Sequence, residues 1–166
     1  MSMSCASLDR MRPAVTPIGL HLTQVSRAVS RAFDEALAAA GGSLPVWLVV
    51  LNLKTRSLAN QRELAEAMGI REATLTHHLN AMEASGLVTR QRDPANRRVH
   101  VVALTEAGEE AFVRLRGAAM AFDRQLRRGI TDQDATTLDD LLGRLAANAG
   151  ADVAGAPWAG LAERTP

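Results

Sequence analysis

Two groups of hydrogen-bonding side chains lie near each other in the middle of the sequence. The first group is small, polar or basic: Arg71, Thr74, Thr76, His77 and Asn80. The second group is a cluster of arginines: Arg90, Arg92, Arg97 and Arg98. Threonine and histidine can hydrogen-bond to base edges or phosphates, and arginine suits phosphates and the negative potential of a narrow minor groove. These residue types point to contact with a nucleic acid.

The first group sits on a segment with helical periodicity. Leu75, Leu79 and Met82 follow the i, i+4, i+7 spacing that puts apolar side chains on one helical face. The opposite face has no large apolar residue and carries these side chains: Ala73, Thr76, His77 and Asn80, with Glu72 and Thr74 at its flanks. A shorter amphipathic segment from Gln61 and a turn at Gly69 precede it. Together they predict a helix-turn-helix, which places its second helix in the DNA major groove.

The arginines belong to a predicted β-hairpin. Residues Val88–Gln91 and Val99–Leu104 are short and rich in strand-forming residues, and Asp93-Pro94-Ala95-Asn96 between them is typical of a turn. Thr105 then suits the N-cap of a further helix. A solvated charged hairpin without a partner is the alternative interpretation of the arginines. Beside a helix-turn-helix, phosphate contact is favoured.

Amphipathic helices flank this central region. From Pro17 to Ala40 an apolar residue recurs every three or four positions, and a second helix runs from Ser43 to about Lys54. After the hairpin, one helix extends as far as Arg128 and another starts at Asp132 or Asp134. The apolar residues of these last two helices are Ala111, Leu115, Ala118, Phe122 and Leu126, then Leu138, Leu141, Leu142 and Leu145. Apolar stripes outside the helix-turn-helix need a partner, and a homodimer is the economical solution.

The expected fold class is mainly α with a small β-hairpin. The chain is divided into a flexible arm (1–16), an N-terminal dimerisation helix (17–42), a winged helix-turn-helix (43–105), C-terminal dimerisation helices (106–148) and a flexible tail (149–166).

Composition limits the class of protein further. The 166 residues carry a net charge of +1, so there is no global signal for binding polyanions. No apolar run approaches the length of a membrane span, and the N-terminal residues lack the apolar region of a secretory signal. A single cysteine, Cys5, excludes an internal disulfide and a multi-cysteine metal cluster. We expect a soluble, cytoplasmic protein without a membrane partner or cofactor.

The histidines do not suggest a metal site. His21, His77, His78 and His100 are scattered along the chain. His77 and His78 point about 100° apart on a helix, so they cannot both face one ligand. His78 borders the apolar stripe and is expected to pack there, whereas His77 is the candidate for DNA.

The combined pattern resembles the MarR family of winged-helix transcriptional regulators. The resemblance is carried by the run from Leu64 to Arg90, by D93-P-A-N-R-R and by V102-A-L-T-E-A-G. It implies a homodimer whose two recognition helices enter successive major grooves of a pseudo-palindromic operator, about 34 Å apart, while the wings reach the flanking minor grooves. It also implies a repressor.

The resemblance assigns roles to particular residues. Thr74, Thr76 and His77 match recognition-helix positions that face DNA in the family, and Arg98 matches the wing arginine. Two positions depart from the family pattern. Asn96 stands where the wing motif has an aspartate, so it can orient Arg98 by a hydrogen bond but cannot form an ion pair. His77 stands where many relatives have an arginine.

Many members of the family bind small aromatic acids between the dimerisation helices and the winged domain, which lowers their affinity for DNA. His21, Trp47 and Arg116 could supply a polar, an aromatic and a cationic contact to such a ligand. The alternative is that these residues occupy ordinary packing and surface positions.

Two other classes of function would leave different features in the sequence. The sequence has no Gly-rich phosphate loop, nucleophile elbow or paired carboxylates at an inferred cleft, so no enzyme is expected. A winged helix used only for protein interaction or dimerisation is the second alternative, favoured by the modest charge and by Asn96. A salt series separates it from a DNA-binding protein, because binding through phosphates weakens steeply as salt rises.

The wing arginine provides a first test. We expect Arg98→Ala to weaken operator binding at least tenfold, about 1.4 kcal/mol or more, because an arginine contact to the DNA groove is lost. A gel-shift titration measures the change. Unchanged affinity would remove Arg98 from the DNA-binding residues.

Overall fold

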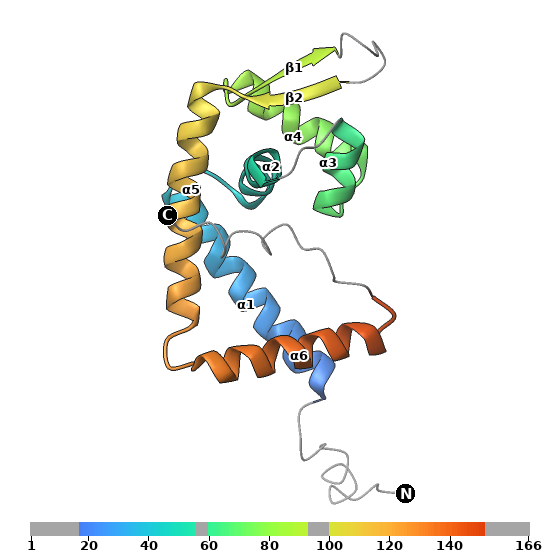
Figure 1. The fold of residues 1–166 in the computed structure, drawn as a ribbon, viewed down its shortest axis with the longest axis vertical. Coiled ribbons are helices and arrows are strands. Elements are labelled where there is room, and N and C mark those ends of the chain that lie inside the picture. The colour runs from blue at the N-terminus through green and yellow to red at the C-terminus, as the bar shows by residue number, and fades with distance from the viewer. Residues whose placement is uncertain (1–16, 56–59, 93–99, 152–166) are drawn as a thin grey trace, which may run out of the picture.

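The computed structural model describes residues 17–55, 60–92 and 100–151, which form six helices and a two-stranded antiparallel sheet (Figure 1). The predicted fold class, mainly α with a β-hairpin, is confirmed. The elements in chain order are α1 (Ile18–Ala39), α2 (Leu44–Thr55), α3 (Gln61–Met68), α4 (Glu72–Ala84), β1 (Val88–Arg92), β2 (His100–Leu104), α5 (Glu106–Leu126) and α6 (Asp132–Asn148).

Local capping signals set several of these boundaries. The Asn60 side chain accepts a hydrogen bond from the Glu63 amide at 3.0 Å and starts α3. Gly69 ends α3 in the left-handed conformation at φ 66°, which confirms the predicted turn. Thr105 caps α5, as expected, and α6 starts at Asp132 behind a reciprocal capping box formed by Thr131 and Asp134. Helix α5 ends at Leu126, slightly before the predicted limit of Arg128.

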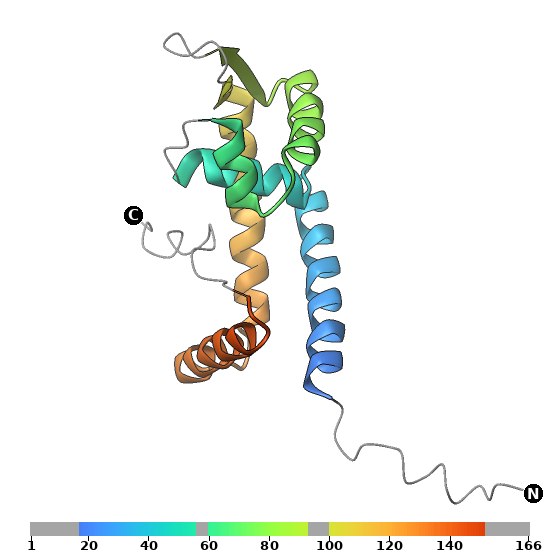
Figure 2. The ribbon, with the colours of Figure 1, turned by 90° about the vertical axis from the view of Figure 1, so that its right-hand side faces the viewer.

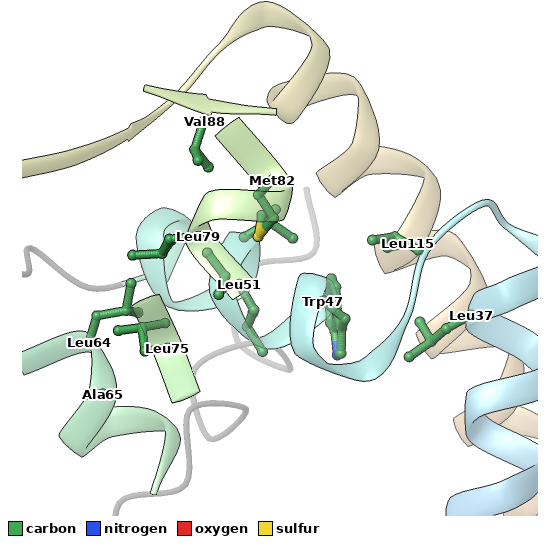
Figure 3. Packing of buried hydrophobic residues seen from close by; sticks show 12 residues of the cluster. Leu37, Trp47, Leu51, Leu64, Ala65, Leu75, Leu79, Met82, Val88 and Leu115 are labelled. Carbon is green, nitrogen blue, oxygen red and sulfur yellow. The ribbon is translucent and has the colours of Figure 1, made fainter. Parts of the chain in front are cut away.

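Helix α2 is the centre of the core. It contacts α1, α3, α4, α5 and β2, and Figure 1 shows it end-on between α5 and α3. Its side chains are apolar on all sides, as a buried helix requires. Figure 3 shows Trp47 and Leu51 from α2 in one buried cluster with Leu75, Leu79 and Met82 from α4. The predicted apolar face of the second helix of the helix-turn-helix is therefore buried.

The hairpin follows α4 and returns the chain to α5. Val88 pairs with Leu104, Arg90 with Val102 and Arg92 with His100 in antiparallel register. The first strand is one residue longer than predicted. The predicted turn at 93–96 lies outside the described residues.

The first turn of α5 lies directly against the turn between α4 and β1. The Thr105 amide donates to the Leu87 carbonyl at 3.1 Å, and its hydroxyl donates to the Gly86 carbonyl at 2.5 Å. A Cβ atom at Gly108 would lie 2.1 Å from the Leu87 carbonyl oxygen. Only glycine allows this approach, so the position of α5 relative to α4 is fixed by backbone contacts.

Helices α1 and α6 extend away from the hairpin end of the molecule (Figures 1 and 2). Near its C-terminal end α1 packs on α5, where Phe33 stacks on Phe122 with 5.1 Å between ring centroids. Leu37 is the one buried residue of α1, and α6 has no buried residue. Large apolar side chains therefore remain exposed on both helices: Ile18, Leu20, Leu22 and Val25 on α1, and Leu138, Leu141 and Leu142 on α6.

None of the described helices is by itself long and apolar enough to cross a membrane. Helices α1 and α2 reach the required length and hydropathy only when taken together, and they are bent by 77° at the break between them.

The contact at Gly108 gives a stability test. We expect Gly108→Ala to lower the free energy of unfolding by about 1–3 kcal/mol, because the new methyl group would overlap a backbone carbonyl. Gly117→Ala in the same helix is the matched control, since nothing lies within 4 Å of the added Cβ in the single chain. The control should be stabilised by up to about 1 kcal/mol through helix propensity. Urea unfolding measures both, and a Gly108→Ala variant as stable as the control would contradict the contact.

Candidate nucleic-acid interface

The outer face of α4 is open to solvent. Arg71, Thr74, His77 and Asn80 are exposed, and Thr76 is half-buried. Because the opposite face is buried against α2, the exposed side chains are held on a fixed helix. His78 is half-buried beside the apolar stripe, in line with the packing position expected from the sequence. The structure thus presents the predicted polar surface.

Thr76 is held by a contact between the two helices of the helix-turn-helix. Gln61, the first residue of α3, donates from Nε2 to Thr76 Oγ1 at 2.7 Å. The Thr76 hydroxyl in turn donates to the Glu72 carbonyl at 2.9 Å. Its proton is therefore used within the protein, and Thr76 fixes α3 against α4 rather than standing as an unoccupied donor. Gln61 is not among the residues predicted from the sequence, where no local pattern links it to Thr76.

Arg90 has different surroundings from those expected of a phosphate ligand. Its Nε donates to Glu83 Oε2 at 3.0 Å, and Nη2 contacts the same carboxylate. Nη2 also donates to Asn80 Oδ1 at 2.7 Å. The Arg90 side chain is only 21% exposed. Its charge is balanced by Glu83, so Arg90 joins strand β1 to α4 instead of projecting freely toward DNA.

The same contact affects the protonation of Glu83. Hydrogen bonds from the Arg90 side chain hold the pKa of Glu83 below its ordinary value. Glu83 therefore stays ionised and keeps Arg90 paired at neutral pH.

The remaining wing arginines cannot be placed in this way. Strand β1 includes the backbone of Arg92, but its side chain is outside the described part of the structure, and so are Arg97, Arg98 and Asn96. Their proposed contacts with DNA stay predictions.

The three residues predicted to bind a ligand are not brought together within one chain. Trp47 is 4% exposed and stacks on Phe112 in the core, with 6.0 Å between ring centroids. His21 is exposed in the first turn of α1, about 24 Å along that helix from the core residue Leu37. Arg116 is half-buried on α5. Trp47 acts as a core residue because α2 packs between α1, α3, α4, α5 and β2.

A groove of ≈ 560 Å³ lies elsewhere, at the elbow between α5 and α6. Its apolar lining includes Leu126, Ile130, Leu138 and Leu142, and its charged lining includes Asp123 and Arg127. None of the three predicted ligand residues lines this groove.

Comparison with known proteins identifies the family. The family model described as MarR matches residues 43–100, from the start of α2 to the start of β2. The crystal structure of transcriptional regulator PA3341 is 30% identical to this chain, with a TM-score of 0.68, and the match covers 98% of that chain and 81% of this one. The chain belongs to the MarR family. It is thus a winged-helix member of a family of DNA-binding transcriptional regulators, as the sequence resemblance implied.

Two further relatives cover most of the chain. A putative transcriptional regulatory protein for the hcr operon of Thauera aromatica is 28% identical over 77% of this chain and 78% of its own length. CouR from Rhodococcus jostii RHA1, bound to p-coumaroyl-CoA, is 28% identical with a TM-score of 0.66, over 78% of this chain and 91% of its own. A structure of the repressor CouR bound to a 23-mer DNA duplex shares the fold, with 24% identity and a TM-score of 0.71.

The pairing of Glu83 with Arg90 gives a pH-dependent test. A carboxylate whose pKa is lowered on folding stabilises the fold above its ordinary pKa of 4.5, and this stabilisation is lost as pH falls through the folded value. We expect the stability difference between the unmodified protein and Glu83→Gln to be larger at pH ~6.5 than at pH ~3. Urea unfolding at both pH values measures it. In an Arg90→Met background, the stability difference caused by Glu83→Gln should no longer depend on pH. A difference that depends on pH as before would contradict the pairing.

Proposed function

We propose that the protein is a cytoplasmic homodimer that binds a pseudo-palindromic operator in double-stranded DNA as a repressor, and that a small-molecule ligand relieves repression. The observation that carries the proposal is the exposed polar face of α4, held rigidly by burial of its opposite face and flanked by the hairpin. In a winged helix-turn-helix, a helix so presented enters the major groove. Base contacts are assigned to Thr74, His77 and Asn80, and phosphate or minor-groove contacts to Arg71, Arg92, Arg97 and Arg98.

The dimer is supported by apolar surface that the single chain leaves uncovered. Ile18 is 67% exposed, Leu20 60% and Leu138 50%. Burial of a leucine or isoleucine side chain stabilises by about 1.5–3 kcal/mol, so covering several of them supports stable association. A second copy that covers α1, α6 and the groove at the α5–α6 elbow accounts for this surface. Twofold symmetry then presents two copies of α4 to one face of the operator.

Ligand control is supported by the family membership and by CouR, a relative whose structure holds p-coumaroyl-CoA. We infer an aromatic acid or its thioester as the ligand class. A ligand changes operator affinity only if it binds more tightly to the dimer conformation in which the two recognition helices are wrongly spaced. Of the three predicted ligand residues, Arg116 remains the candidate for ligand contact. It lies on α5, the helix that joins the winged domain to the elbow before α6.

DNA selection followed by a salt series tests the function. Purified protein should enrich a pseudo-palindromic motif from random duplexes, with half-site centres about 34 Å apart. Affinity for that motif should fall as salt rises, with a log–log slope of about 0.9 per phosphate contacted. A protein-interaction module would enrich no motif, and that result would overturn the proposal.

The dimer is tested by a charge on the exposed stripe of α6. We expect Leu138→Glu to shift the protein to monomers in sedimentation and to weaken operator binding about 100-fold or more, because linked binding to the second half-site is lost. Val113→Glu is the control, since Val113 is also an exposed apolar residue, 68% accessible, but lies on α5 outside the stripes of α1 and α6. A monomeric unmodified protein, or a dimeric Leu138→Glu variant, would contradict the assigned interface.

A further inference from the structure

The contact between Arg90 and Asn80 joins the wing to the proposed DNA-reading face. We propose that Arg90 fixes the hydrogen-bonding direction of the Asn80 amide, so that Asn80 offers chiefly its Nδ2 donors to DNA and favours guanine at one position of each half-site. The inference rests on the proposed DNA-binding function and names a specificity-determining residue within it. Arg90 acts as a positioning residue.

The direction of the Asn80 amide follows from its partner. An asparagine side chain has one acceptor oxygen and one nitrogen with two donor hydrogens. Arg90 Nη2 donates to Asn80 Oδ1 at 2.7 Å. A flipped amide would place two donors against each other, so the positively charged guanidinium permits one orientation only.

Arg90 is itself held in place. Its Nε donates to Glu83 at 3.0 Å, and the side chain is 21% exposed. Asn80 and Glu83 are three residues apart and share one side of α4. The guanidinium is thus fixed by a carboxylate on the same helix that carries the amide it orients. A fixed donor keeps the amide oriented before DNA binds.

The exposed position of Asn80 places its remaining donors on the surface that reads DNA. Asn80 lies three residues after His77 and four after Thr76, which puts all three on one helical face. With Oδ1 directed to Arg90, the Nδ2 hydrogens are the groups best available to contact a base.

An amide that acts chiefly as a donor prefers a different base from an unrestrained one. An unrestrained asparagine forms two hydrogen bonds to adenine: its oxygen accepts from N6 and its nitrogen donates to N7. Oδ1 is directed to Arg90, and accepting from its positively charged donor weakens the second lone pair as an acceptor, so Asn80 forms that pair with adenine poorly. Guanine presents two adjacent acceptors, N7 and O6, to the major groove. The geometry therefore favours guanine over adenine at the position that Asn80 reaches.

In vitro selection from random duplexes tests the inference with four proteins: unmodified, Asn80→Ala, Asn80→Asp and Arg90→Met. The unmodified protein should prefer guanine over adenine by about tenfold at one position of each half-site. Asn80→Ala should reduce this preference to about twofold or less while the rest of the motif is kept. Asn80→Asp, which has no donor, should lose guanine and favour cytosine, whose N4 amino group is a donor.

Arg90→Met separates orientation from simple structural support. Without the guanidinium, the Asn80 amide can turn, donate to Glu83 and expose its oxygen, so adenine should replace guanine at that position. A role in folding alone would weaken binding to all sequences equally and leave the preferred base unchanged. Because Asn80 is exposed, Asn80→Ala and Asn80→Asp test whether the Asn80 amide acts as a donor to the base even if Arg90→Met fails to fold.

The outcomes distinguish this inference from the proposed function. An enriched motif whose bases are the same in the unmodified protein, Asn80→Ala and Asn80→Asp would overturn the role of Asn80 while operator binding stands. A folded Arg90→Met protein that still selects guanine would overturn the role of Arg90. Failure of the unmodified protein to enrich any motif would overturn both the inference and the proposed function.

Discussion

The arrangement of the molecule depends on the close contact between the start of α5 and the turn that follows α4. Thr105 donates twice to this turn, and Gly108 has no side chain that could keep the two backbones apart. Helix α5 is also the element that carries the chain out to α6. A rotation of α5 would therefore act on the end of α4 mainly through backbone atoms and the short Thr105 side chain. For a dimeric regulator, this contact is what would convert a change at the dimer interface into a change in the spacing of the recognition helices.

The surface proposed to face DNA is built from paired polar groups. Gln61 holds Thr76, and Glu83 holds Arg90, which in turn holds Asn80. Each of these contacts restrains a side chain before a partner arrives, which lowers the conformational entropy lost on binding. The cost is that Arg90 contributes little net charge, in a protein whose total is only +1. In the proposed complex, attraction to phosphates falls to the arginines around this surface, and α4 contributes specificity.

The apolar surface of the single chain is distributed unequally. The core around α2 is complete, since α1, α3, α4, α5 and the hairpin all contact it. The N-terminal half of α1 and all of α6 bury almost nothing. Apolar helices without a core are stable only when another surface covers them. Parts of α1 and α5 therefore belong to the same core as the helix-turn-helix, whereas the N-terminal half of α1 and the whole of α6 have the features of an interface.

The sequence by itself determined the elements and the faces of the helices. Apolar spacing identified the buried side of α4, Gly69 marked the turn and Thr105 marked the start of α5, because these signals act within a few residues of the chain. Only the tertiary structure decided which side chains from other elements lie opposite those faces. In that structure Trp47 is buried in the core, Gln61 donates a hydrogen bond to Thr76, and Arg90 donates hydrogen bonds to Glu83 and Asn80. Periodicity predicts on which face of its own helix a residue lies. The residue that it contacts on another element depends on how the elements pack, and no local sequence pattern contains that information.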